Sequence, residues 1–344
     1  LMLTITPPLA DATVMYTTNG TVPALNNGIE YTGAIAITRT TALRARAFKQ
    51  GHLPSATITH TYLVNEMDVK QTLPAMCLVG DEERDLFEPH GLMAISGGYS
   101  NWWPATEVDH YNHGTPTGRA YEWPVSAELI YPDDNRSVQI NAGLRTAGQG
   151  GRGSRRRGPD WSQQTYKYDL RLYFRSSYGT ERLEFPVYTN SPVATFDKIC
   201  IKSGFWDDCI NPALKDELFR RLMLDCGQLA SHGIHVNLYI NGVYKTYYNL
   251  IERPDDEFFR DHYNSTNEWE VMKFAVSEGN TVMWTAMQNF VKSGTNSPLV
   301  QANYEWMAAR LDLVTFIDYL LVSIYAHNSD WPINNWVCAR EHKE

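Results

Sequence analysis

A glycine-rich segment, GQGGRGSRRRG at residues 148–158, is the first stretch of this 344-residue chain whose residue types can do chemistry. Glycines let backbone N–H groups approach phosphate oxygens, and Arg155 adds positive charge beside them. The segment is not a Walker loop, because no Gly-Lys-Ser/Thr sequence opens a helix. A solvated basic hairpin tip fits the same residues, and on this segment alone we favour that interpretation over phosphate binding.

A lysine follows this loop on the predicted strand YKYDLRLYF. Period-two alternation places Lys167 on one face of the strand with Asp169 and Arg171. In protein kinases a lysine on the strand after a glycine-rich loop binds nucleotide phosphates and pairs with a helix carboxylate. Asp216 or Glu217, in the predicted helix ALKDELFRRLM, offers that carboxylate. A plain surface lysine and a solvated helix face are the alternative.

An Asp-x-x-x-x-Asn spacing occurs at Asp330 and Asn335, in HNSDWPINNW. Protein kinases place their catalytic loop, with this spacing, directly after a buried helix. Here the spacing follows ANYEWMAARLDLVTFIDYLLVSIYAH, which is apolar on nearly all sides from Leu311 on and predicts a buried central helix. The spacing arises by chance about once in a chain of this size, so its position after that helix is what gives it weight.

The elements that must position these residues begin at about residue 73. Short predicted strands (PAMCLVG, PVSAELIY, SVQINAGLRTAG) come first, and helices dominate the later part. Between them lies a predicted hairpin, GIHVNLYINGVYKTYYNLIE, which turns at Asn241-Gly242. This order predicts an α+β fold with a sheet-rich half, a helix-rich half and a ligand cleft between the halves.

Residues 1–64 are predicted to form a separate small β-sandwich. Asn19-Gly20 is a strong turn signal, and the alternating runs GAIAITRTTALRARAFK and ATITHTYLV follow it. Apolar residues on one face and Thr or Arg on the other fit an antiparallel sandwich. We therefore expect domains at residues 1–64 and 73–344.

Composition narrows the function classes. The net charge of −9 argues against general nucleic-acid binding, and no apolar run reaches the length of a membrane-spanning helix. The five cysteines are too scattered for a zinc site, since there is no Cys-x-x-Cys pair. Cys200 and Cys209 can form a disulfide in an oxidising compartment, and free buried thiols fit equally well.

The N-terminal segment resembles the chitobiase/hexosaminidase C-terminal-type module, an immunoglobulin-like accessory domain. The resemblance lies in YTTNGTVP at 16–23, YTGAI at 31–35, LRARA at 43–47 and Pro54-Ser55. Asn19 replaces the usual Asp, which a turn tolerates.

Residues 73–344 resemble the spore-coat CotH kinase family. The matching blocks, in order, are AGLRTAGQGGRGSRR, YKYDLRLYFRSSYG, LKDELFRRLMLDCGQLASHG, VNLYINGVYKTYYNLIERPDDEFF and NSDWPINNW. The resemblance implies an atypical protein-kinase-like fold with two lobes. It also implies use of ATP with Mg²⁺ or Mn²⁺, and phosphorylation of secreted or spore-surface proteins.

The resemblance assigns nucleotide-binding roles block by block. Ser154 and Arg155 correspond to the phosphate-side residues of the glycine-rich loop, and Lys167 to the family's strand lysine, paired with a helix acid. Glu252 ends the hairpin where a kinase hinge passes the nucleotide, so it is expected near the adenine or ribose, or holding the hinge. A structural salt bridge in the neighbourhood of Arg253 is the alternative for Glu252.

The resemblance further makes Asp330 the catalytic aspartate and Asn335 a metal ligand. The family continues to a Pro-Trp-Asp-x-Asp segment, whose aspartate binds metal, whereas this sequence ends at Glu344. We therefore expect a CotH-type domain that is incomplete at its C-terminus, with weak ATP binding and little or no phosphoryl transfer.

Three functions follow, in order of preference. The first is an extracellular or cell-surface kinase that moves the γ-phosphoryl of ATP to a Ser or Thr hydroxyl of a protein substrate. The second is a non-catalytic pseudokinase that acts as a surface scaffold. The third is a carbohydrate-associated enzyme, which the accessory module favours. No paired carboxylates stand out on neighbouring strand ends, as glycoside hydrolysis requires.

Overall fold

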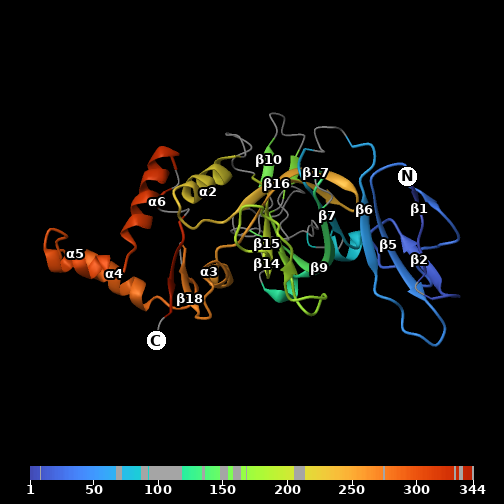
Figure 1. Cartoon of the computed structure of the whole chain (residues 1–344), viewed down its shortest axis with the longest axis horizontal. Helices are drawn as coiled ribbons and strands as arrows, with labels where there is room; N and C mark the ends of the chain where they lie inside the picture. The colour runs from blue at the N-terminus through green and yellow to red at the C-terminus, as the bar shows by residue number, and fades with distance from the viewer. Residues whose placement is uncertain are drawn as a thin grey trace, which may run out of the picture. The chain divides into compact units, whose positions relative to one another are not determined.

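The chain folds into two compact units (Figure 1). The first comprises residues 1–187, 194–213 and 233–251, and the second comprises residues 188–193, 214–232 and 252–344. The computed structural model describes residues 1–7, 9–66, 72–86, 92, 118–133, 136–147, 154–157, 164–167, 169–204, 214–273, 276–328, 331–332 and 336–342. The fold is mixed α+β, as the order of predicted elements indicated.

The N-terminal residues form two small antiparallel sheets. A four-stranded sheet has the order β3-β2-β5-β6, from strands β2 (Thr13–Thr17), β3 (Ile29–Glu30), β5 (Thr41–Phe48) and β6 (Ile58–Tyr62). Strand β1 (Met2–Leu3) pairs with β4 (Ile35–Ala36). The predicted turn is present, since Gly20 has a φ of 81° and Asn19 Oδ1 accepts a hydrogen bond from the Thr21 N–H at 3.2 Å.

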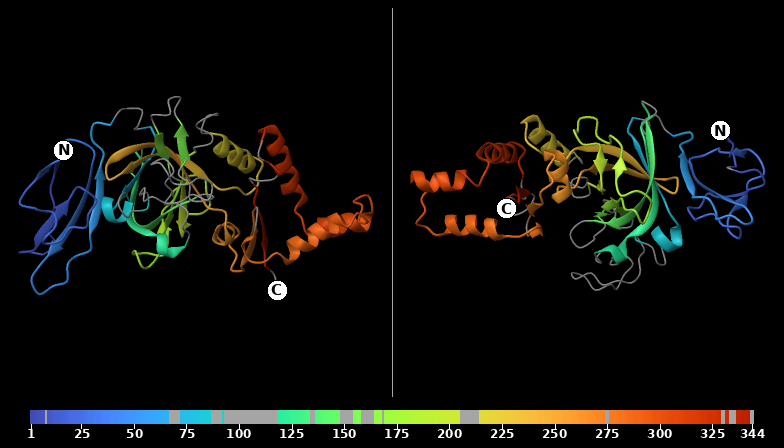
Figure 2. Two further views of the ribbon diagram at one scale, coloured as in Figure 1. Left: turned by 180° about the vertical axis from the view of Figure 1, so that it is seen from behind. Right: turned by 60° about the horizontal axis from the view of Figure 1, so that its bottom comes forward.

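A closed seven-stranded barrel forms the main sheet of the first unit (Figures 1 and 2). Its order is β12-β15-β17-β16-β7-β8-β9, antiparallel throughout except for the parallel pair β16 and β7. The strands are β7 (Ala75–Val79), β8 (Trp123–Ile130), β9 (Ser137–Thr146), β12 (Leu170–Tyr173), β15 (Lys198–Lys202), β16 (Gly233–Ile240) and β17 (Val243–Ile251).

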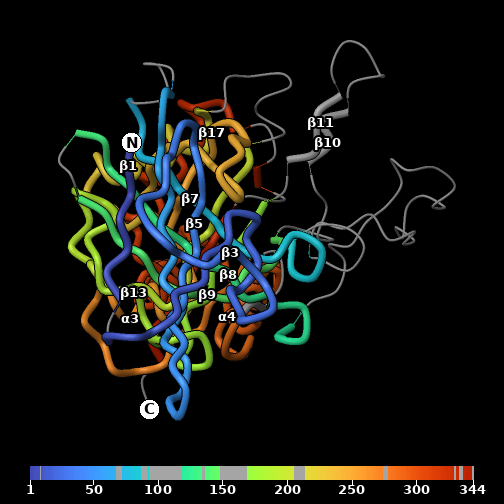
Figure 3. The backbone as a smooth tube through the Cα atoms, turned by 90° about the vertical axis from the view of Figure 1, so that its right-hand side faces the viewer, coloured from blue at the N-terminus to red at the C-terminus, as the bar shows by residue number. Residues whose placement is uncertain are grey.

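Burial of branched aliphatic side chains stabilises the barrel, and closure removes the exposed edges of an open sheet. The tube in Figure 3 shows β7, β8 and β9 as neighbours. Their sheet buries Leu78, Leu144, Leu172, Ile201, Leu238 and Leu250 almost completely. Two short helical turns, Glu82–Leu86 and Arg119–Tyr121, and the small pair β13 (Leu183–Glu184) with β14 (Thr195–Phe196) also belong to this unit.

The predicted strand YKYDLRLYF is divided in two, which corrects the expectation of one continuous strand. Strand β11 (Gln164–Lys167) ends before Asp169, and β12 begins at Leu170. Asp169 Oδ1 accepts hydrogen bonds from the Ser203 N–H at 2.6 Å and the Ser203 hydroxyl at 2.7 Å. Asp169 is therefore hydrogen-bonded to Ser203, the residue that follows β15, directly before the chain enters barrel strand β12.

The second unit combines helices with a three-stranded sheet. The helices are α2 (Lys215–Asp225), α3 (Asp256–Tyr263), α4 (Val282–Lys292), α5 (Gln301–Ala308) and α6 (Leu313–Tyr325). The sheet has the order β19-β18-β20, from β18 (Trp269–Met272), β19 (Val276–Glu278) and β20 (Cys338–Glu341). Within the described part of the chain, no helix combines the length and apolar character needed to cross a membrane.

Helix α6 is not the buried central helix that its composition predicted. Only Val322 and Ser323 are buried, whereas a stripe of apolar side chains is exposed, namely Val314, Ile317, Leu321 and Ile324. The partners of α6 lie on one side: Gln228, which follows α2, donates to Asp318 at 2.7 Å, and the Phe219 and Tyr319 rings meet edge to face. Apolar residues all round a helix show what it is able to bury, but the neighbouring elements decide what is covered.

A buried carboxylate links the N-terminal sheets to the barrel. Glu128 on β8 accepts a hydrogen bond from the Thr61 N–H at 2.7 Å, and the His60 ring nitrogen Nδ1 lies 2.9 Å from its other oxygen. Both partners are on β6. The hydrogen bond to Glu128 raises the pKa of His60 above its ordinary value, against the opposing effect of burial.

This contact predicts that stability depends on pH. Because the folded state holds the His60 proton more tightly than the unfolded chain, the contribution is complete below about pH 6.5 and is lost as the pH rises through the folded-state pKa. Chemical denaturation of the wild type between pH 6 and 8.5 should show this loss in the free energy of unfolding. His60→Gln should flatten the dependence, and His52→Gln, at an exposed histidine, should leave it unchanged. An equal slope in His60→Gln and wild type would contradict the assignment.

Candidate functional site

Two predicted nucleotide-binding residues lie opposite each other in the backbone. Strand β10 (Ser154–Arg157) pairs antiparallel with β11, so that Ser154 is the Cα partner of Lys167 and Arg155 that of Tyr166. The predicted glycine-rich loop thus precedes a hairpin that brings Ser154 and Lys167 together. The roles of Ser154, Arg155 and Lys167 remain predictions.

The predicted catalytic and metal-binding residues, Asp330 and Asn335, lie outside the residues that the structure describes. Cys209 lies outside them as well, while the other four cysteines, Cys77, Cys200, Cys226 and Cys338, are free thiols. The proposed roles of Asp330 and Asn335 therefore rest on the sequence.

The two acids considered as partners of Lys167 lie in the first turn of α2. Glu217 is buried and paired within its own helix: its oxygens lie 2.9 Å from Arg220 and 2.7 Å from Arg221. Asp216 is exposed, 3.5 Å from Arg220. The pairing of either acid with Lys167 stays a prediction, since Lys167 belongs to the other unit.

A bulge in the β16–β17 hairpin determines which residues meet at its base. Near the turn, Asn241 and Gly242 both have positive φ, as an Asn-Gly hairpin turn requires, and Ile240 pairs with Val243. Farther along, β17 contains one extra residue, and Thr246 has a φ of 81°. The register then pairs Gly233 with Ile251, so the next pair outward is His232 with Glu252.

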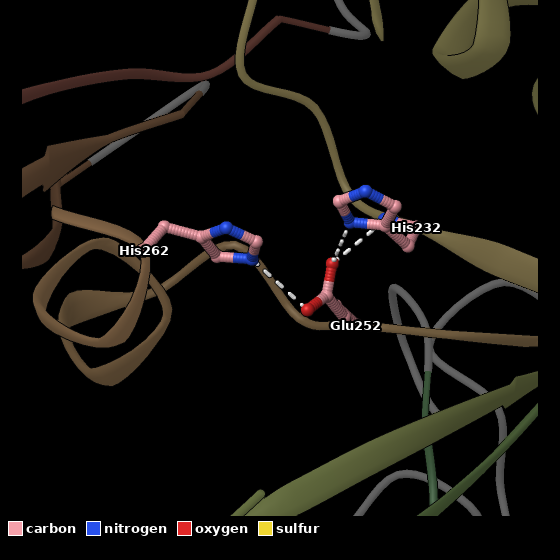
Figure 4. Close-up of side chains that lie close together, drawn as sticks. All are labelled: His232, Glu252 and His262. Atoms are coloured by element: carbon pink, nitrogen blue, oxygen red, sulfur yellow. Dashed lines mark hydrogen bonds and ion pairs between the residues drawn. The ribbon is translucent and has the colours of Figure 1, made fainter. Parts of the chain in front are cut away.

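The carboxylate of Glu252 is the centre of a buried cluster with two histidines (Figure 4). Its oxygen Oε2 accepts hydrogen bonds from the His232 backbone N–H at 2.7 Å and lies 2.9 Å from His232 Nδ1. Its oxygen Oε1 lies 3.0 Å from His262 Nε2. His262 belongs to α3, so the carboxylate joins His232 to this helix within the second unit.

The surroundings hold both imidazoles in place. Each ring approaches a different oxygen of the carboxylate, and the rings are nearly parallel to each other, with centroids 5.6 Å apart. The Tyr188 ring lies 6.3 Å from that of His232, and the Phe258 ring lies 4.4 Å from that of His262. Phe258 is buried on α3, whose N-terminus is capped by Asp255. Arg253 pairs with Asp255 at 3.3 Å, while Glu252 pairs with His232 and His262.

Glu252 is ionised at neutral pH. Burial, the largest influence, raises the pKa of its carboxyl group, but the hydrogen bonds from His232 and His262 lower it, and the net pKa lies below the ordinary value. The cluster therefore combines one carboxylate with two imidazoles, which are groups that bind metals or relay protons. It is the one such gathering of His, Cys, Asp or Glu found among the described residues.

The sequence contained only part of the signal for this cluster. Glu252 was singled out because it ends a predicted hairpin, whereas His232 and His262 were not. An Asn-Gly turn without a bulge would pair His232 with Ile251 and leave Glu252 opposite Ser231. The extra residue in β17 changes that pairing, and no residue type near Thr246 announces it.

A second buried charge cluster lies inside the first unit and has a structural explanation. Glu122 accepts hydrogen bonds from Arg145 at 2.6 Å and Arg175 at 2.9 Å, and Arg145 lies over the Tyr173 ring. A Cβ atom at Gly143 would come within 2.4 Å of the Glu122 side chain, so a glycine is needed there. The guanidinium groups compensate the carboxylate within the barrel wall.

The region that contains the histidine cluster matches a known protein family. Residues 155–344 match the family model described as CotH kinase protein. The chain belongs to the CotH kinase protein family. The CotH match begins inside β10, at Arg155, and includes α2 and all three residues of the histidine cluster.

Residues 3–62 match a model described as Fn3 associated. The expected accessory module in front of the CotH domain is thereby confirmed. A search of curated proteins found no match.

The Glu252 cluster leads to a prediction about stability. Glu252→Ala removes the acceptor for three buried donor groups, and breaking a buried charge-assisted network costs about 3 kcal/mol of the free energy of unfolding. Urea denaturation monitored by tryptophan fluorescence measures the change. Glu305→Ala, at an exposed position on α5, is the control and should lie within about 0.5 kcal/mol of wild type. Equal stabilities of the two variants would contradict the structural role of Glu252.

Proposed function

We propose that this chain is a protein kinase domain of the CotH type, which transfers the γ-phosphoryl group of ATP to a Ser or Thr hydroxyl of a protein substrate. The family match over residues 155–344 carries this proposal, because it includes Arg155, Lys167, Asp330 and Asn335. The proposed architecture is an atypical kinase-like domain of two lobes behind an immunoglobulin-like sandwich.

The backbone of the β10–β11 hairpin supports a phosphate-binding role for its residues. Ser154 lies opposite Lys167, directly after the glycine-rich segment. A lysine and a hydroxyl at adjacent positions are suited to bind the oxygens of a phosphate chain. In this proposal Lys167 and Arg155 balance the phosphate charge, and Ser154 donates its hydroxyl.

Asp330 and Asn335 take the roles that their spacing implies. ATP supplies the phosphoryl group, and Mg²⁺ or Mn²⁺ neutralises charge on the phosphates. Asp330 orients the substrate hydroxyl and accepts its proton, while Asn335 is a ligand of the metal. Catalysis of this type depends on positioning and on compensation of charge more than on covalent chemistry.

A non-catalytic scaffold is the second candidate. It is favoured by the pairing of the two described acids: Glu217 is bound by Arg220 and Arg221, and Glu252 by His232 and His262. Acids that are already satisfied by neighbours are less available to a nucleotide or to Lys167. In either case we propose an extracellular or cell-surface location, with surface proteins or carbohydrate-associated assemblies as partners.

Nucleotide binding and transfer are tested on the same preparation. ATP with Mn²⁺ should raise the melting temperature, because a ligand at 100 times its Kd adds about 2.7 kcal/mol of stability. Lys167→Ala should remove the shift. Transfer of radiolabelled phosphate to a generic protein substrate or to the chain itself should fall about 100-fold or more in Asp330→Asn.

Glu305→Gln serves as the control, because Glu305 is exposed and lies in the second unit, as Asp330 does. This variant should keep both the melting shift and the transfer. Absence of any melting shift at millimolar ATP would favour the scaffold. Transfer that survives Asp330→Asn would reject Asp330 as the catalytic residue.

A further inference from the structure

We propose that His232, Glu252 and His262, all in the second unit, form a binding site for a divalent transition-metal ion of the Zn²⁺ type, which joins His232 and Glu252 to α3. This site is separate from the Mg²⁺ or Mn²⁺ of the proposed kinase reaction, and it stands whether or not the chain transfers phosphate. Its ligands are two imidazole nitrogens and a carboxylate.

The donor set selects the class of metal. Imidazole nitrogen is a preferred ligand of Zn²⁺ and its first-row neighbours, whereas Mg²⁺ prefers oxygen ligands throughout. Two histidines and one glutamate are a familiar zinc ligand set that leaves a fourth position for water. The cysteines gave no sign of this site because it uses none of them.

The geometry requires little adjustment to accept an ion. One ligand atom from each residue lies within 4.8 Å of the others, and the carboxylate oxygens lie 2.9 and 3.0 Å from the two ring nitrogens. Ligand atoms about 2.1 Å from a zinc ion are about 3.0 to 3.4 Å apart, depending on the angle between the bonds. The two nitrogen–oxygen contacts therefore already have a spacing close to that of neighbouring zinc ligands.

The charge of the cluster provides the physical reason for a cation. The Glu252 side chain is only 3% exposed, and among the described residues its hydrogen-bond and ion-pair partners are His232 and His262. The cluster thus places a carboxylate in a buried position, where a bound cation would compensate its charge.

The cluster is also preorganised as a metal site requires. Its ligands come from three segments: the residue before β16, the residue after β17 and the last turn of α3. The Glu252 N–H donates to the His232 carbonyl at 3.2 Å, which fixes two of the ligands relative to each other. Phe258 packs against His262 and Tyr188 against His232, which holds the two imidazole rings in position.

The test uses the full chain, freed of metal with a chelator and then titrated with Zn²⁺ or Co²⁺ in the absence of nucleotide. We expect one ion per chain by mass spectrometry under native conditions. Bound Co²⁺ should show the visible absorption that is typical of a low coordination number. His232→Gln and His262→Gln should each weaken Zn²⁺ affinity at least about 100-fold. His327→Gln, at an exposed histidine in the same unit, is the matched control and should bind as the wild type does.

X-ray absorption at the zinc edge is measured on the zinc-loaded wild-type protein. This test therefore does not depend on whether a variant folds. Two imidazole ligands and no sulfur would support the site, and sulfur ligation would overturn it. The proposal is also overturned if the metal-free chain binds neither ion below about 100 µM, or if both histidine variants fold and bind as tightly as wild type. Mg²⁺ at the same concentrations should not compete, which separates this result from any outcome of the ATP experiments.

Discussion

The buried carboxylate of Glu252 is the interaction on which the arrangement of His232, Glu252 and α3 depends. A single side chain accepts hydrogen bonds from the backbone and ring of His232 and from the ring of His262. Because Glu252 and its two partners come from three segments, moving any one of them leaves a buried charge or a buried donor unsatisfied. The bulge at Thr246 is therefore as important as the cluster itself, since it sets the register that places His232 opposite Glu252.

Buried acids are used in the same way elsewhere in the molecule. Glu122 is compensated by Arg145 and Arg175 within the barrel, and Glu128 joins β8 to His60 and Thr61 on β6. In the Glu122 cluster two arginines supply the positive charge. In the Glu128 cluster His60 supplies it when its ring is protonated. The Glu252 cluster differs from the Glu122 cluster because its partners are two histidines, which are cationic only when protonated, and not arginines. That difference is why a metal ion is a reasonable component of this cluster and not of the Glu122 cluster.

The described residues that are considered for the kinase reaction belong to two different units. Ser154 and Lys167 are paired across β10 and β11 in the first unit, whereas Glu217 and the Glu252 cluster belong to the second. A kinase mechanism requires both sets, with Asp330 and Asn335, to act on one nucleotide. The histidine cluster requires only the second unit, so metal binding and phosphoryl transfer are independent properties that separate experiments can measure.

Sequence by itself determined the family, the accessory module, the mixed α+β class and the Asn241-Gly242 turn, because each depends on residue types in a local or ordered pattern. It placed Glu252 at the end of a hairpin but not among histidines, since a one-residue bulge leaves no mark in hydrophobic alternation. It also predicted a buried α6, whereas burial depends on which elements pack against a helix, and α6 exposes Leu321 and Ile324. Tertiary structure alone decided the closed barrel, the division at Asp169 and the meeting of His232, Glu252 and His262. Those features arise from pairings between residues far apart in the chain, which local sequence patterns do not encode.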